Sequence, residues 1–294
     1  MNKKYKAIIY IILSAFCFAF MNLFVRLSGE IPSFQKCFFR NFVALFFALF
    51  VLLKNRQSFK WKKGNFKFLL LRSAVGTLGI VCNFYAIDHI PLADASILNK
   101  MSPFFVIIFS FLILKERLTF LQGAAVFIAF IGTLFIIKPS FQNIDLFPSI
   151  VGLLGGLSAG FAYTMVRVLG TKGENGSLIV FFFSAFSCIA MLPYLIFDFH
   201  PMELWQLLML IGAGLSAAGG QFSITAAYYN APAREISVYD YSQIIFATLL
   251  GLIFLGELPD LYSFIGYAVI ISMALLMFLY NNHKWFFKNR EQQK

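Results

Sequence analysis

Two charged residues inside long apolar segments are the first candidates for chemistry in this sequence. Lys100 lies well inside the apolar segment 92–114, and Asp240 is the one acidic residue well inside the segment 233–255. A charge at the centre of a hydrocarbon layer costs at least about 2.5–3.5 kcal/mol, so such residues mark substrate sites, coupling sites or static pairs. We predict that Lys100 and Asp240 form an ion pair that a substrate or a proton can open. A permanent salt bridge is the structural alternative.

Other polar residues in apolar segments extend this set. Arg72 and Asn83 lie on one helical stripe with two glycines between them, because their spacing follows steps of three and four residues. Arg40 lies near the start of another apolar segment, and either arginine could instead reach the membrane surface with its long side chain. Asn99 and Tyr241 are the neighbours of Lys100 and Asp240 in the chain. The candidate site residues are therefore Lys100, Asp240, Arg72, Asn99, Asn83, Tyr241 and Arg40.

The charges of these residues predict the charge of a substrate. Arg40, Arg72 and Lys100 outnumber Asp240, so the apolar interior carries a surplus of positive charge. We therefore expect a substrate with an anionic group, such as a carboxylate or a phosphate. Neutral side chains that could add hydrogen bonds, or could simply pack between helices, are Tyr163, Gln221, Tyr239, Tyr241 and Gln243.

The composition requires a membrane around these residues. The 294 residues are 60% hydrophobic and 13% charged, with a mean hydropathy of +0.79. A soluble domain is about 45–50% apolar and about 25% charged, so part of this chain must face lipid. A helix needs about 20 apolar residues to cross the hydrocarbon layer. The expected membrane-spanning segments are 7–27, 35–53, 68–87, 92–114, 120–137, 148–168, 177–197, 205–228, 233–255 and 261–281.

The basic residues predict the orientation. Most Lys and Arg residues outside the apolar segments fall on the side of the N-terminus, including those in 54–67 and those after residue 281. Basic loops stay in the cytoplasm, so we expect a multi-pass protein of the inner membrane with both termini cytoplasmic and the first helix uncleaved. This distribution also explains the net charge of +11, so we expect no nucleic-acid partner.

The chain contains an internal repeat. Arg26 and Arg167 are 141 residues apart, and the same shift relates Gly79 to Gly220 and Pro91 to Pro232. Each half holds five segments, and because five is odd the second half must cross the membrane in the opposite sense. Inverted repeats of this kind are common in secondary transporters. We expect an all-α fold of ten transmembrane helices in two inverted five-helix repeats, 1–140 and 141–294.

Two long segments resemble a known family. They are YAIDHIPLADASILNKMSPFFVIIFSFLILKERLT (85–119) and APAREISVYDYSQIIFATLLGLIFLGELP (231–259). Both resemble the fourth helix and its repeat counterpart in the EamA family of the drug/metabolite transporter superfamily. FFRN (38–41) and LRSAVGTLG (71–79) resemble a subgroup of that family with arginines in its second and third helices. The resemblance implies ten helices, a central cavity between the repeats, and transport of a small metabolite, but it names no substrate.

Helix ends carry further charges that we interpret as structural. Glu116 and Glu257 precede the short links to the fifth and tenth helices, where a carboxylate can cap a helix start. Arg26 and Arg167 end their segments, so we expect them to anchor at the membrane surface. Proline lacks a backbone donor, so Pro103 predicts a kink inside the fourth helix.

Other classes of protein fit the sequence less well. GLSAG (156–160) matches a nucleophile pattern, but that pattern needs a strand-to-helix turn, and Ser158 lies in an expected helix. The histidines lie outside the apolar segments, so we expect no enzyme, no metal site and no cofactor. A channel or a signalling scaffold remains an alternative, as does a multidrug or amino-acid exporter of the same superfamily. The expected partners are a small-molecule substrate, lipid and a coupling proton or ion, in a monomer or homodimer.

Overall fold

The protein is all helical in the part of the chain that the structure describes. A computed structural model describes residues 3–89, 98–116, 119–137, 146–256 and 261–291, and none of these forms a strand. The elements are α1 (Lys3–Leu27), α2 (Ser33–Lys54), α3 (Phe66–His89), α5 (Ser102–Leu114), α6 (Phe120–Ile137), α7 (Leu146–Thr171), α8 (Gly176–Phe197), α9 (Leu204–Asn230), α10 (Ala233–Ile236), the 3₁₀ turn η1 (Ser237–Tyr241), α11 (Ser242–Leu250), the π turn η2 (Gly251–Leu255) and α12 (Leu261–Glu291).

These elements confirm ten apolar helical segments, although residues 92–97 of the predicted segment 92–114 lie outside the described residues. Seven described segments are long and apolar enough to cross a membrane: α1, α2, most of α3, most of α7, α8, α9 and the run from Ala233 to Leu255. Shorter apolar helices lie in α5, α6 and α12. Large hydrophobic side chains such as those of Phe50, Leu112 and Ile189 point outward from the bundle, as a lipid-facing surface requires.

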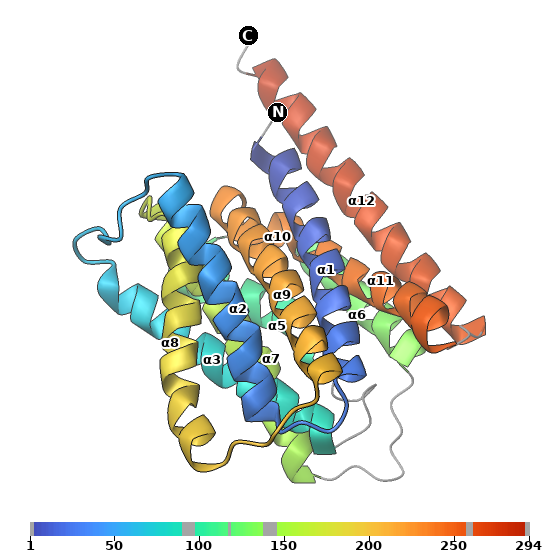
Figure 1. Cartoon of the computed structure of the whole chain (residues 1–294). Coiled ribbons are helices and arrows are strands. Elements are labelled where there is room, and N and C mark those ends of the chain that lie inside the picture. The colour runs from blue at the N-terminus through green and yellow to red at the C-terminus, as the bar shows by residue number, and fades with distance from the viewer. Residues whose placement is uncertain (1–2, 90–97, 117–118, 138–145, 257–260, 292–294) are drawn as a thin grey trace.

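The second half of the bundle is inverted relative to the first. The start of α1 and the end of α12 lie at the same end of the bundle, which we name the terminal side (Figure 1). The opposite end is the distal side. α1 runs from the terminal to the distal side, whereas α7, the first helix of the second half, runs from the distal to the terminal side (Figure 1). The two halves therefore span the bundle upside down relative to each other, as the odd number of segments predicts.

The two halves interlock rather than stand side by side. α1 packs on α9, α3 on α7, α2 on α8 and α6 on α12, so every one of these interfaces joins one helix from each half. The 141-residue shift turns the α3–α7 interface into the α9–α1 interface. A Cβ on Gly79 would lie 3.3 Å from the Ala159 backbone nitrogen, and a Cβ on Gly220 would lie 2.7 Å from the Phe18 ring. These two close approaches are the same contact repeated by the pseudo-two-fold symmetry.

Helical geometry breaks at corresponding places in both halves. The chain turns at Lys100 and Met101 before α5 begins, and Pro103 lies in the first turn of α5. Pro103 therefore starts a helix, where its missing donor is harmless, instead of kinking a continuous one. In the second half, Asp240 lies in the 3₁₀ turn η1 between α10 and α11. Breaks near the middle of membrane helices free backbone groups and shape sites in transporters.

The close contact of α7 with α5 depends on glycine. A Cβ on Gly160 would lie 2.5 Å from the Cβ of Phe105 and 3.0 Å from the carbonyl oxygen of Ser102. Such an approach leaves no room for a side chain, because the neighbours are close to the helix backbone. Gly123 in α6 is the opposite case, since a Cβ added to it would meet no heavy atom of a neighbour within 4 Å.

We predict that Gly160→Ala lowers the thermal stability of the detergent-purified protein. Alanine favours a helix over glycine by up to about 1 kcal/mol, but overpacking here costs about 1–3 kcal/mol. The matched control Gly123→Ala should keep or slightly raise the melting temperature. A melting temperature for Gly160→Ala at or above that of Gly123→Ala would contradict the described α5–α7 contact.

Candidate functional site

A cavity of about 820 Å³ lies between the two halves. Its lining comes from α1, α2, α3, α7, α8, α9, η1, α11 and η2, together with Asn99, Lys100 and the first residue of α5, Ser102. On the distal side the lining reaches the last turns of α1 and η2 and the first turn of α2. None of the described lining residues lies in a helix turn at the terminal side. The cavity therefore runs from the middle of the bundle toward the distal side, and its volume suits a small metabolite.

The predicted pair of Lys100 and Asp240 is present on one wall of this cavity. The Nζ atom of Lys100 lies 3.5 Å from Oδ2 of Asp240 and donates a hydrogen bond of 2.7 Å to Oε1 of Gln243. The side chains of the pair are 8% and 6% exposed. Because both charges are removed from bulk water, each depends on the other for its stabilisation.

Tyr241 supports this wall from behind. It is fully buried, it is not among the cavity-lining residues, and its hydroxyl donates to the carbonyl oxygen of Lys100 over 3.4 Å. The sequence groups Tyr241 with the substrate-contacting candidates, whereas the structure places it in the packing beneath them. The 141-residue shift relates Lys100 to Tyr241, so this contact joins symmetry mates and lies at the pseudo-two-fold axis.

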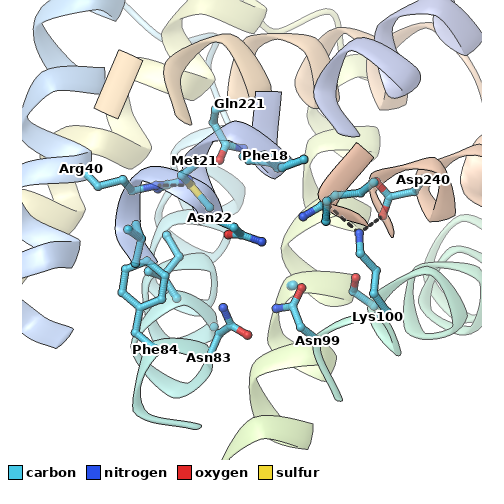
Figure 2. Close-up of a pocket in the computed structure, with 18 of the residues that line it drawn as sticks. Phe18, Met21, Asn22, Arg40, Asn83, Phe84, Asn99, Lys100, Gln221 and Asp240 are labelled. Atoms are coloured by element: carbon cyan, nitrogen blue, oxygen red, sulfur yellow. Dashed lines mark hydrogen bonds and ion pairs between the residues drawn. The ribbon is translucent and has the colours of Figure 1, made fainter. Parts of the chain in front are cut away.

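Arg40 lies on the opposite wall of the cavity from Lys100 and Asp240 (Figure 2). It is 4% exposed, so it does not reach the membrane surface. Its Nη1 atom donates to Oδ1 of Asn41 over 2.7 Å, and its Nε atom lies 3.4 Å from the Met21 sulfur. Both partners are neutral, so no carboxylate in the described part of the chain neutralises this guanidinium.

Arg72 is buried at the inner end of the cavity. Its side chain is 1% exposed, and its Cζ atom lies over the ring of Phe183 at 3.8 Å from the ring centre. The sequence left open whether Arg72 lies inside the bundle or reaches the membrane surface. The structure places its guanidinium inside the bundle. Arg72 and Arg40 thus both contribute positive charge to the cavity.

Amide side chains lie between the two charged walls. Asn83 and Asn99 line the cavity as expected, and Asn22 of α1 joins them (Figure 2). The sequence reasoning missed Asn22, although a signal was present. Asn22 is the symmetry mate of Tyr163 under the 141-residue shift, and Tyr163 also lines the cavity. Gln221 and Gln243, which we considered as hydrogen-bonding residues, line it too.

The cavity is strongly positive. Asp240 is the one acidic residue among the lining residues that the structure describes, and the basic ones are Arg26, Lys36, Arg40, Arg72 and Lys100. Low-dielectric walls focus such a field into the cleft and raise the local concentration of anions. Arg26 and Lys36 lie near the distal ends of their helices, where the cavity lining reaches the distal side.

The terminal side is closed by a group of contacts that we name the terminal latch. Nε of Arg167 lies 3.1 Å from Oε1 of Glu116, and its Nη1 atom donates to the carbonyl oxygens of Tyr229 (3.2 Å) and Tyr228 (3.5 Å). The latch ties α7 to the end of α9 and to the residue pair that follows α5. The rings of Tyr163 and Tyr228 stack 5.5 Å apart, and they connect the two places because Tyr163 lines the cavity while the Tyr228 carbonyl belongs to the latch.

These contacts correct two expectations about helix ends. Glu116 pairs with Arg167 and does not cap α6. The cap of α6 comes instead from Thr119 and Gln122, whose side-chain oxygens each accept a hydrogen bond from the other residue's backbone nitrogen. Arg167 is a partner in the terminal latch rather than an anchor at the membrane surface. Glu257 lies outside the described residues.

The family of the protein follows from its two halves. Residues 5–138 and residues 146–279 each match the family model described as the EamA-like transporter family. The chain belongs to the EamA-like transporter family. The double match agrees with the inverted duplication of the fold, and the membrane-spanning helices make this EamA-like protein a multi-pass membrane protein.

Curated relatives of this EamA-like chain are named as transporters. The pseudopaline exporter CntI of Pseudomonas aeruginosa is 34% identical over 90% of this chain and 93% of its own length. An uncharacterized transporter of Helicobacter pylori is 30% identical over 92% of this chain and 93% of its own length. The human solute carrier family 35 member G1 is 25% identical over 90% of this chain and 76% of its own length.

A solved crystal structure shares the fold. It superposes with a TM-score of 0.82 at 15% sequence identity, over 94% of this chain and 98% of that chain. At this identity the likeness shows the fold alone. Ser158, the residue that suggested an enzyme, lies in the interior of α7 and not at a strand-to-helix turn. This position and the names of the relatives fit a transporter rather than an enzyme.

We predict that Lys100 and Asp240 are coupled in a double-mutant cycle. Removing one partner leaves a buried charge alone, so Lys100→Met or Asp240→Asn should each destabilise the protein, by up to about 3–5 kcal/mol. The double variant should recover much of that loss, because no charge is left unpaired. Thermal melts of the four proteins in detergent measure the cycle. Losses that simply add in the double variant would show that the two charges do not stabilise each other.

Proposed function

We propose that the protein is a secondary-active transporter that carries a small organic anion across the inner membrane by alternating access. One observation carries this proposal: in the described part of the chain, a cavity with more basic than acidic lining residues lies between two inverted halves, and its lining reaches the distal side but not the terminal side. Inverted repeats with a site at their interface support a mechanism in which the halves exchange conformations. Membership of the EamA-like transporter family supports the transport of a solute.

The charge of the cavity supports an anionic substrate. Arg40 and Arg72 line the cavity with no carboxylate among their partners in the described residues, so a neutral or cationic solute would leave a costly surplus of positive charge in place. An organic anion would reduce that surplus when it binds between the walls of Arg40 and Lys100. An amino-acid-like solute also fits, because it carries a carboxylate and its ammonium group could approach Asp240.

The ion pair between Lys100 and Asp240 could couple the binding of a substrate or a proton to the conformational change. An anionic group that enters the cavity competes with Asp240 for the Lys100 ammonium. A proton on Asp240 would have the same effect, because it removes the charge that holds Lys100. Lys100 and Asp240 belong to different halves and both sit at helix breaks, so opening their contact loosens the seam between the halves. Substrate or proton binding would thereby favour the conformational change.

The orientation that we propose follows from the basic residues. The terminal side carries the basic segment 54–67 and would face the cytoplasm, and the distal side would face outward. The described conformation would then be open to the outside, with the terminal latch closed. In the opposite conformation the latch opens. Arg26, the symmetry mate of Arg167, lies at the distal mouth, where the symmetric closure would form.

The relatives support export as the direction. The pseudopaline exporter CntI is 34% identical and matches nearly the whole chain. An exporter takes up its solute while open to the cytoplasm and releases it from the outward-open conformation. We therefore propose that the described conformation is the one that releases the substrate.

We predict saturable, Lys100-dependent flux in proteoliposomes. A thermal-shift screen of the purified protein against metabolites identifies binders, since a ligand at 100 times its Kd stabilises by about 2.7 kcal/mol. Radiolabelled flux is then measured for each binder. Lys100→Met should reduce the flux at least tenfold, because it removes the cation that the anion contacts, while Lys60→Met, which removes an exposed lysine outside the cavity, should not.

Two results would contradict this proposal. The first is flux that rises linearly with solute concentration, because that is the behaviour of a channel. The second is the absence of flux for every solute that stabilises the folded protein.

A further inference from the structure

Arg72 is the cavity's most buried cation, and its environment is a slot. Phe183 of α8 covers one side of the guanidinium at 3.8 Å. On the helix side, a Cβ on Gly76 would overlap Nη1 of Arg72 and would lie 3.1 Å from the Phe183 ring. Glycine at position 76 therefore makes the space in which the guanidinium lies. The side chain therefore lies against the Phe183 ring and beside Gly76, one turn along its own helix.

Two nitrogen atoms of the Arg72 guanidinium donate no hydrogen bond in the described part of the chain. Nε and Nη1 are both buried without a hydrogen-bond partner in the described part of the chain. These two nitrogens belong to different edges of the planar group, so each of the two edges that can grip a carboxylate has an unused N–H. A buried charged donor without an acceptor is costly, and proteins keep such a group where something else completes it.

No carboxylate of the protein completes it in the described residues. Asp240, the acidic residue of the lining, is already engaged by Lys100 on another wall. Arg40 differs from Arg72, since its Nη1 is satisfied by Asn41 and its Nε by Met21. Of the two arginines, Arg72 is thus the one with unused donors, and it lines the cavity.

We propose that Arg72, held against the Phe183 ring and beside Gly76, forms a carboxylate subsite, so that the transported solute carries a carboxylate. This inference rests on the proposed transport function and narrows its substrate class. A carboxylate is planar and can lie in the plane of the guanidinium with two parallel hydrogen bonds. Because the Phe183 ring covers one face of the guanidinium, a planar carboxylate fits in the plane of the group, whereas a tetrahedral phosphate would place oxygen atoms out of that plane, on the side of the ring.

The role of Phe183 follows from the same geometry. A guanidinium over an aromatic ring is attracted to it, and the contact restricts rotation of the planar group. Lysine carries the same charge but has no planar fork and stacks less well. Arg72→Lys therefore separates a geometric role in gripping a carboxylate from a purely electrostatic role in attracting any anion.

The test measures competition for flux in proteoliposomes by matched acid and amide probes. The probes are succinate against succinamide, L-glutamate against L-glutamine, and nicotinate against nicotinamide, with inorganic phosphate as the tetrahedral anion. In the wild-type protein the acid of at least one pair should compete at least tenfold better than its amide and better than phosphate. Arg72→Lys should weaken that acid at least tenfold and leave phosphate within about threefold. Phe183→Leu should weaken the acid several-fold.

The controls distinguish an effect at the Arg72 subsite from a general effect of substituting an arginine and from a failure of transport. Arg56→Lys, an exposed arginine outside the cavity, should behave as the wild type. If Arg72→Lys does not fold, Phe183→Leu still tests the slot. Saturable flux with acids no better than amides, or with acid affinity unchanged in both slot variants, would overturn the carboxylate subsite and leave the transport proposal intact. A wild-type protein that moves no solute would instead overturn the proposed function, and the subsite with it.

Discussion

A lysine and a carboxylate in the middle of a hydrocarbon layer must stabilise each other, and the rest of this structure is arranged around that requirement. Lys100 and Asp240 come from different halves, and each lies where regular α-helix is interrupted. Such interruptions are tolerated at membrane depth only where the chain is buried or lines a cavity. The ion pair, the helix breaks and the cavity are therefore aspects of one site at the seam between the repeats.

The inverted duplication explains how this site could open to each side of the membrane in turn. Each interface between halves exists as a symmetric pair, as the α1–α9 and α3–α7 contacts show. The terminal side is closed by Arg167 and Glu116, while the cavity extends to the distal side. In the alternating-access mechanism that we propose, the two halves exchange conformations, so that the closed side opens.

Much of this arrangement could be predicted from sequence because its causes are local or periodic. Apolar length revealed the ten segments, and the constant shift of 141 residues revealed the inversion and brought Lys100 close to Asp240. Details that depend on tertiary packing could not be predicted. The direction in which Tyr241 points is set by the 3₁₀ turn, and the Arg167–Glu116 pair joins residues 51 positions apart through the packing of α7. Asn22 was not predicted, because apolar residues surround it in the sequence. The 141-residue shift, which relates it to Tyr163, could have identified it.

Double electron–electron resonance between spin labels tests the exchange of the two halves most directly. One label pair, on cysteines at Phe34 in the first turn of α2 and Leu255 at the end of η2, reports the distal mouth, and a second pair at Leu114 and Lys172 reports the terminal side, each in a background without the four native cysteines. Exchange of the halves predicts opposite changes when a transported solute is added: the distal distance shortens in the same fraction of molecules in which the terminal distance lengthens. Distances that change in the same direction, or that stay fixed while the protein carries solute, would contradict it.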